Sequence, residues 1–191
     1  MELLTFILIL FCSFMLRLIF ILGDTSDDYF HLWNVGLVKK NKTFICPAVS
    51  NSIIKGYKGY SSLPHAIISL FPKQYWVFAG KILNIAWDIL SIILLYFLVV
   101  LCLAWIYPDM SSWQRFYSKL TIIALYSFSP ILFPISARLK TMGGRVLGNL
   151  INIIYFTFFV FAYLFGYSWC YLGCIIFGLI MVYASQFGLQ K

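Results

Sequence analysis

Three of the six acidic residues of this 191-residue chain lie within nine positions, in the segment 23–31, directly behind a hydrophobic first stretch. A carboxylate at a membrane–water interface can act as a general base toward a hydroxyl group that approaches it. Two adjacent carboxylates, such as Asp27 and Asp28, also raise each other's proton affinity. If the segment is helical, His31 lies four residues after Asp27 on the same face and could orient the carboxylate or contact a phosphate.

Asp27 and Asp28 are therefore the candidate catalytic residues. The alternative is a solvated helix N-terminus, where Asp complements the positive end of the helix dipole. A divalent metal held by Asp27, Asp28 and His31 is possible, but no further oxygen or nitrogen ligands are obvious nearby, so no metal or other cofactor is predicted.

A second set of polar residues occurs in the loop 138–149, where Arg138, Lys140 and Arg145 surround a pair of glycines. Arg forms bidentate hydrogen bonds with phosphate, and glycines let backbone N–H groups approach it. These cations are candidate phosphate ligands. The alternative is a basic loop whose long side chains only anchor the helix ends at the headgroup level.

The third set is Lys81, Asn84 and Asp88, which share one stripe of a predicted helix. An unpaired charge within hydrocarbon is expensive, so Asp88 is expected to face other helices and to pair with Lys81 or another cation. A structural role is favoured over a transport path. Arg17 could instead pair with the acidic segment 23–31.

The elements that must position these residues are membrane helices. Hydrophobic residues make up 62% of the chain and charged residues 10%, whereas a soluble domain carries about 25% charge. The apolar runs are continuous and long enough to cross a bilayer at about 20 residues each. The net charge of +8 indicates contact with lipid phosphates or an anionic substrate, or else charges that set the topology.

The predicted fold is all-α: a single transmembrane domain over residues 1–191 with about five transmembrane helices. The predicted spans are 3–22, 75–107, 120–137, 150–168 and 170–188, with an external loop at 23–74 and a short polar turn at 108–119. Within the long loop, 27–40 and 63–71 read as short amphipathic helices, the second started by Pro64 and including His65. Such helices tend to lie in the headgroup plane.

The orientation of the chain is predicted differently by two arguments. The loops 23–74 and 138–149 hold nine of the fourteen basic residues, so the positive-inside rule favours an external amino terminus. The family resemblance described next implies the opposite, with these loops facing outward.

The layout resembles the GT-C superfamily of membrane glycosyltransferases, which use polyprenyl-phosphate sugars. The resemblance rests on a first span leading into Asp27-Asp28-Tyr29, on the aromatic and proline-containing run 59–65, on the basic stretch 138–148 and on the style of the segment 185–190. It implies an inverting transfer at the outer face of the cytoplasmic (inner) membrane, from a polyprenyl-phosphate-linked sugar donor to an acceptor hydroxyl.

In that resemblance Asp27 matches the base and Asp28 its partner, while Arg138, Lys140 and Arg145 would contact the donor phosphate. His31 and His65 complete the predicted substrate-binding set. Family members are far longer, so this chain is expected to be a fragment or to need a missing carboxy-terminal half or a partner subunit. Membrane lipids are expected partners and nucleic acid is not. The alternative functions are a non-catalytic integral membrane subunit and a transporter component.

Overall fold

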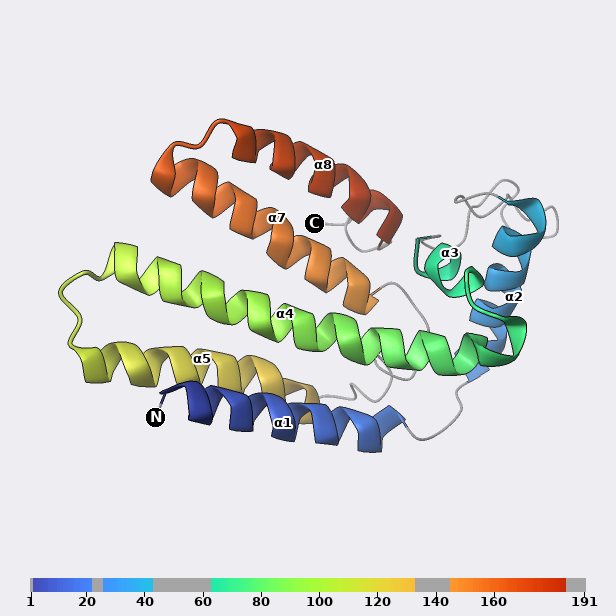
Figure 1. The fold of residues 1–191 in the computed structure, drawn as a ribbon, viewed down its shortest axis with the longest axis horizontal. Coiled ribbons are helices and arrows are strands. Elements are labelled where there is room, and N and C mark those ends of the chain that lie inside the picture. Colours follow the sequence, from blue (N-terminus) through green and yellow to red (C-terminus); the bar gives the residue numbers. More distant parts are fainter. Residues whose placement is uncertain (1, 22–25, 43–62, 133–144, 185–191) are drawn as a thin grey trace.

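The computed structural model describes residues 2–21, 26–42, 63–132 and 145–184. Within these residues the protein consists of seven α-helices and one short 3-10 helix (Figure 1). The helices are α1 (Glu2–Ile21), α2 (Ser26–Asn41), α3 (Leu63–Ser69), η1 (Lys73–Tyr75), α4 (Trp76–Ile106), α5 (Ser112–Leu132), α7 (Arg145–Phe165) and α8 (Trp169–Ala184). The predicted all-α class is confirmed.

Helix α4 is the centre of the arrangement. Its 31 residues span about 46 Å, which exceeds the hydrocarbon thickness of about 30 Å. Helices α1 and α5 pack on one side of α4, and α7 with α8 packs on the other (Figure 1). The chain thus forms two helix groups, α1–α4–α5 and α7–α8, that meet along α4 and α7.

Three stretches are long and apolar enough to cross a membrane: Glu2–Ile19, Lys73–Ile106 and Val146–Phe165. A shorter apolar helix covers Trp169–Met181. These helices turn large apolar side chains outward, as Leu4, Leu8 and Phe11 do on α1, while α1 buries Ser13 and Arg17. A surface this apolar is stable against lipid and not against water, so the chain is an integral membrane protein.

Two predicted boundaries were wrong. The region 108–119, expected to be a polar turn, is largely helical because α5 begins at Ser112. The reason is a reciprocal cap: the Ser111 hydroxyl accepts a hydrogen bond from the Gln114 backbone N–H (3.3 Å), and the Gln114 side-chain oxygen accepts one from the Ser111 N–H (3.1 Å). Helix α7 likewise begins at Arg145, five residues before the predicted span.

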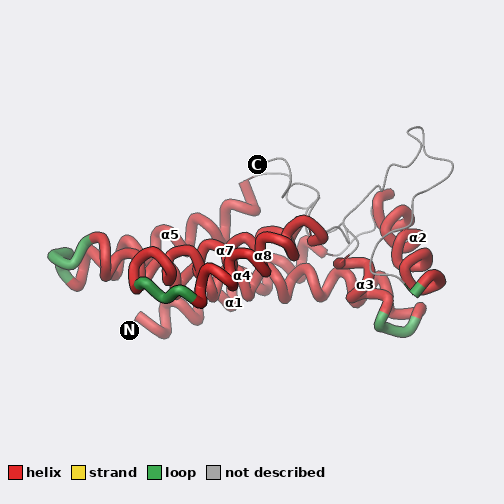
Figure 2. The backbone as a smooth tube through the Cα atoms, turned by 90° about the horizontal axis from the view of Figure 1, so that it is seen from above, coloured by secondary structure: helices red, strands yellow, loops and turns green. Residues whose placement is uncertain are grey.

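The two short helices predicted in the first loop are confirmed as α2 and α3. Figure 1 and Figure 2 both show α2 running across the end of the bundle, while the long helices run along its main axis. Helix α2 buries Val35 and Val38 against the rest of the protein and exposes Tyr29 and Trp33. Exposed aromatic residues on a crosswise helix are typical of the membrane–water interface.

Candidate functional site

One end of the bundle gathers most of the predicted site. Helices α2 and α3 lie there, together with the last turn of α1 and the first turn of α4 (Figure 1). We call this the α2–α3 end. Arg138 and Lys140 lie outside the described residues.

The predicted catalytic pair occupies the start of α2. The backbone of Asp27 and Asp28 forms the first turn of this helix, which places His31 one turn after Asp27 on the same face. Arg145 is the first residue of α7. The side chains of Asp27, Asp28 and Arg145 lie outside the described part of the structure, so the roles of these residues stay predictions.

The structure brings the two predicted substrate-binding histidines together. His31 Nδ1 on α2 lies 2.9 Å from His65 Nε2 on α3, and the rings stack with centroids 5.2 Å apart. Both residues are buried, with 3% and 0% of their surface exposed. One ring must donate its N–H to the lone pair of the other, so this contact contains at most one proton. The histidine pair therefore joins α2 to α3 one helical turn after Asp27.

A second contact fixes α2 and α3 on the start of α4. The Lys39 ammonium donates to the Phe71 carbonyl oxygen (3.3 Å) and lies 5.4 Å from the centre of the Trp76 ring. The Trp76 indole N–H donates to the same carbonyl (2.9 Å). Val35 and Ile68 pack on Trp76 as a small core. Helix α2 is thus held by the His31–His65 contact and by the contacts of Lys39 and Val35 around Trp76.

Helix α3 also reaches the α7–α8 group. Its residues Leu63 and Ile67 pack against the cluster formed by Leu147, Leu150 and Ile151 on the first turns of α7. Helix α3 therefore bridges α2, α4 and the start of α7.

A polar cluster that the sequence only partly indicated lies inside the α1–α4–α5 group. Arg17 Nε on α1 donates to Asp88 Oδ2 on α4 at 2.6 Å, and both residues are buried. Arg17 Nη1 also donates to the Ser13 carbonyl (3.0 Å), to the Ser13 hydroxyl and to the Ser127 carbonyl (3.3 Å). The guanidinium thus joins α1, α4 and α5.

The Arg17–Asp88 ion pair bears on two expectations from the sequence, the partner of Arg17 and the partner of Asp88. Arg17, considered above as a partner for the acidic segment 23–31, bonds to Asp88 on α4. Asp88 faces other helices as predicted, and its partner is Arg17 rather than Lys81. Part of the signal was present in the sequence, because Arg17 is the lone charge of the predicted span 3–22 and Asp88 is the lone acidic residue of the predicted span 75–107. Opposite charges within hydrocarbon gain most by meeting.

A third polar contact closes the opposite end of α1. Glu2 forms an ion pair with Lys119 on α5 and accepts a hydrogen bond from the Tyr96 hydroxyl on α4 (2.8 Å). A buried layer of Phe6, Ile92 and Ile123 lies along the same three helices. On α1, Phe6 stands between Glu2 and Ser13, so this apolar layer separates the two ion pairs.

Two ion pairs, Arg17–Asp88 and Glu2–Lys119, thus join α1 to α4 and α5. Within the described ranges, no group of three or more His, Cys, Asp or Glu side chains is placed to hold a metal ion.

No family model matches the chain, and neither a curated protein nor a solved structure resembles it significantly.

Proposed function

We propose that all five long helices of this chain cross the membrane and that its α2–α3 end carries a glycosyl-transfer site. The donor would be a sugar linked to polyprenyl phosphate, and the acceptor a hydroxyl group at the outer face of the cytoplasmic membrane. The observation that carries the proposal is the position of α3, which contacts α2 through the His31–His65 pair and packs on the first turns of α7. Helix α3 thereby links the helix that contains Asp27 and Asp28 to the helix that begins at Arg145.

The five-span arrangement is supported by the order of the helices. Helices α1, α4, α5, α7 and α8 run in alternating directions along one axis, as consecutive membrane spans do (Figure 1). In α5 the Lys119 ammonium is paired with Glu2, while Leu125 is exposed as a lipid-facing residue would be. Pairing the charge removes the main obstacle to placing α5 in a bilayer.

In the proposed reaction Asp27 accepts the proton of the acceptor hydroxyl. The hydroxyl oxygen attacks the anomeric carbon, and the bond from that carbon to the phosphate oxygen breaks, so the lipid phosphate leaves with the electron pair. Arg138, Lys140 and Arg145 would stabilise the charge that develops on the phosphate. Asp28 and the His31–His65 pair would hold the first turn of α2 in position.

The test is transfer activity in membranes that contain the full chain. Membranes would be supplied with a panel of radiolabelled polyprenyl-phosphate hexoses and pentoses, and loss of label from the lipid fraction would be measured. Removing a general base costs about 10²–10⁴-fold in rate, so Asp27→Asn should lower transfer by that factor. Asp109→Asn is the matched control, because Asp109 is an exposed carboxylate in the turn between α4 and α5.

Two results would contradict the proposal. One is a panel in which no donor is consumed above the level of membranes lacking the protein. The other is an Asp27→Asn variant, present at normal levels, that transfers sugar as fast as the unaltered chain. Either result would favour the second candidate, a non-catalytic integral membrane subunit or transporter component.

That second candidate has its own supporting observation. The buried polar residues of α4, Lys81, Asn84, Asp88 and Ser91, form one stripe that faces the interior of the bundle. The apolar layer around Ile92 follows directly after this stripe, which suits a scaffold better than a continuous path across the membrane.

A further inference from the structure

The two helix groups meet at two levels along α4 and α7. Toward the α2–α3 end, Trp87 of α4 packs on Val146 at the start of α7. Toward the opposite end, the rings of Trp105 on α4 and Phe165 on α7 meet edge to face, with centroids 5.9 Å apart. Helices α4 and α7 lie close together at the start of α7 and farther apart toward its end (Figure 1).

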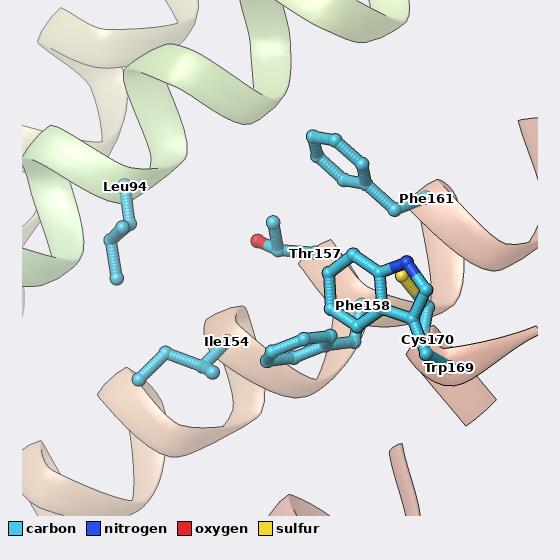
Figure 3. A pocket seen from close by; sticks show the side chains of 7 residues that line it. All are labelled: Leu94, Ile154, Thr157, Phe158, Phe161, Trp169 and Cys170. Carbon is cyan, nitrogen blue, oxygen red and sulfur yellow. The ribbon is translucent and has the colours of Figure 1, made fainter. Parts of the chain in front are cut away.

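A cavity of about 280 Å³ occupies the space between the two contacts. Figure 3 shows Leu94 of α4 facing Ile154, Thr157 and Phe161 of α7 across it, with Trp169 of α8 near its edge. The other lining residues are Phe158 and Cys170.

The lining of this cavity offers nothing to a polar ligand. The Thr157 hydroxyl, its most polar group, donates to the Ile153 carbonyl oxygen of its own helix at 2.8 Å. Lys, Arg, Asp, Glu and His are absent from its wall. A water molecule needs two to four polar partners, so a cavity of this kind does not hold water, and left empty its wall loses dispersion contacts.

We propose that this cavity binds one acyl chain of a membrane phospholipid. Helices α4 and α7 belong to the stretches long and apolar enough to cross the bilayer, so the phase beside the cavity is hydrocarbon. The absence of charged groups on the wall excludes the headgroup, which stays outside.

The position of the aromatic residues assigns the lipid to one leaflet. Trp105, Tyr107, Trp113 and Trp169 are exposed at the end of the bundle opposite the α2–α3 end, as expected for side chains at the headgroup level. Leu94 lies eleven residues before Trp105 on α4, which places it about 16 Å deeper. This depth corresponds to the acyl region, so the chain enters from the leaflet farthest from α2 and α3.

The experiment uses the full chain in phosphatidylethanolamine–phosphatidylglycerol vesicles with a phospholipid that carries a diazirine in the middle of one acyl chain. After illumination, cross-linked residues are mapped by mass spectrometry. Labelling is expected at Ile154, Phe158 and Phe161, and it should resist dilution with unlabelled lipid better than labelling at the outward-facing Phe159.

Two variants fill the cavity from opposite walls, Thr157→Trp and Leu94→Trp, so that one remains informative if the other does not fold. Each should reduce cross-linking inside the cavity at least fivefold and leave Phe159 labelled. Phe156→Trp is the matched control, because Phe156 is a neighbour of Thr157 on α7 but is 50% exposed. It should leave the cavity labelled.

Three outcomes would overturn the proposal. The first is labelling confined to outward-facing residues. The second is cavity labelling that both filling variants leave unchanged. The third is displacement of the phospholipid label by a few per cent of unlabelled polyprenyl phosphate, which would assign the cavity to an isoprenoid chain instead. None of these outcomes depends on transfer activity, so the lipid site and the glycosyl-transfer site can fail separately.

Discussion

Neutralising Asp88 while keeping Arg17 should destabilise the protein strongly. In the structure, Arg17 is 2% exposed and its only carboxylate partner among the described residues is Asp88, at 2.6 Å. The Asp88→Asn variant keeps a hydrogen-bond acceptor but removes the charge. Arg17 would then be a buried, uncompensated cation between three helices.

The size of the effect follows from two independent estimates. Removing one partner of a buried ion pair costs about 3–5 kcal/mol. Placing an unpaired Arg at the centre of a membrane helix costs about 2.5–3.5 kcal/mol on insertion scales. Because Arg17 keeps its bonds to the carbonyls of Ser13 and Ser127, we expect the lower value, about 3 kcal/mol. This loss corresponds to a fall of about 6–12 °C in the thermal midpoint for a chain of this size.

A double-mutant cycle separates the pair from its surroundings. The free energy of unfolding would be measured by denaturant titration in one lipid–detergent mixture for Asp88→Asn, Arg17→Met and the combination. Removing both charges from a buried pair is often close to neutral, so the double variant should be more stable than either single variant. Asp109→Asn, at an exposed turn, controls for loss of a carboxylate as such and should change little.

The reasoning would be refuted if the two single effects add to the double effect within about 0.5 kcal/mol, as they do for independent sites. It would also be refuted if Asp88→Asn unfolds at the same midpoint as the unaltered protein. In either case the ion pair would not hold α1 against α4.

Two further predictions concern packing and topology. A methyl group on Gly173 of α8 would lie 2.5 Å from the Phe158 ring of α7, so Gly173→Ala should cost about 1–3 kcal/mol of unfolding free energy. Gly178→Ala is the control and should cost clearly less, because its new methyl group would lie 3.8 Å from the nearest neighbouring atom. Equal losses of unfolding free energy in the two variants would contradict this account. The topology can be tested with single cysteines in a chain whose native cysteines are replaced. A membrane-impermeant maleimide should reach Tyr29→Cys on α2 and Asp109→Cys in the α4–α5 turn from opposite sides of the membrane. Labelling of both cysteines from one side would exclude the proposed spans.

The sequence determined the class of this protein because a chain with so many apolar side chains is stable in lipid and not in water. Long continuous apolar runs satisfy their backbone in lipid as helices, and helical periodicity identified α2 and α3. The Ser111–Gln114 cap was also readable as a Ser-x-x-Gln pattern, so the late start predicted for α5 was avoidable. These signals are local, and each lies within one element.

The tertiary structure alone decided which faces meet. The lipid-facing and helix-facing sides of a membrane helix are both apolar, so periodicity does not say that α4 contacts α1, α5 and α7 at once. The contact of His31 with His65 joins residues that no spacing rule connects. The partner of Asp88 and the apolar cavity beside Leu94 likewise depend on how whole helices pack. Lipid does not distinguish these faces as water would, and only the fit of side chains between helices selects one arrangement.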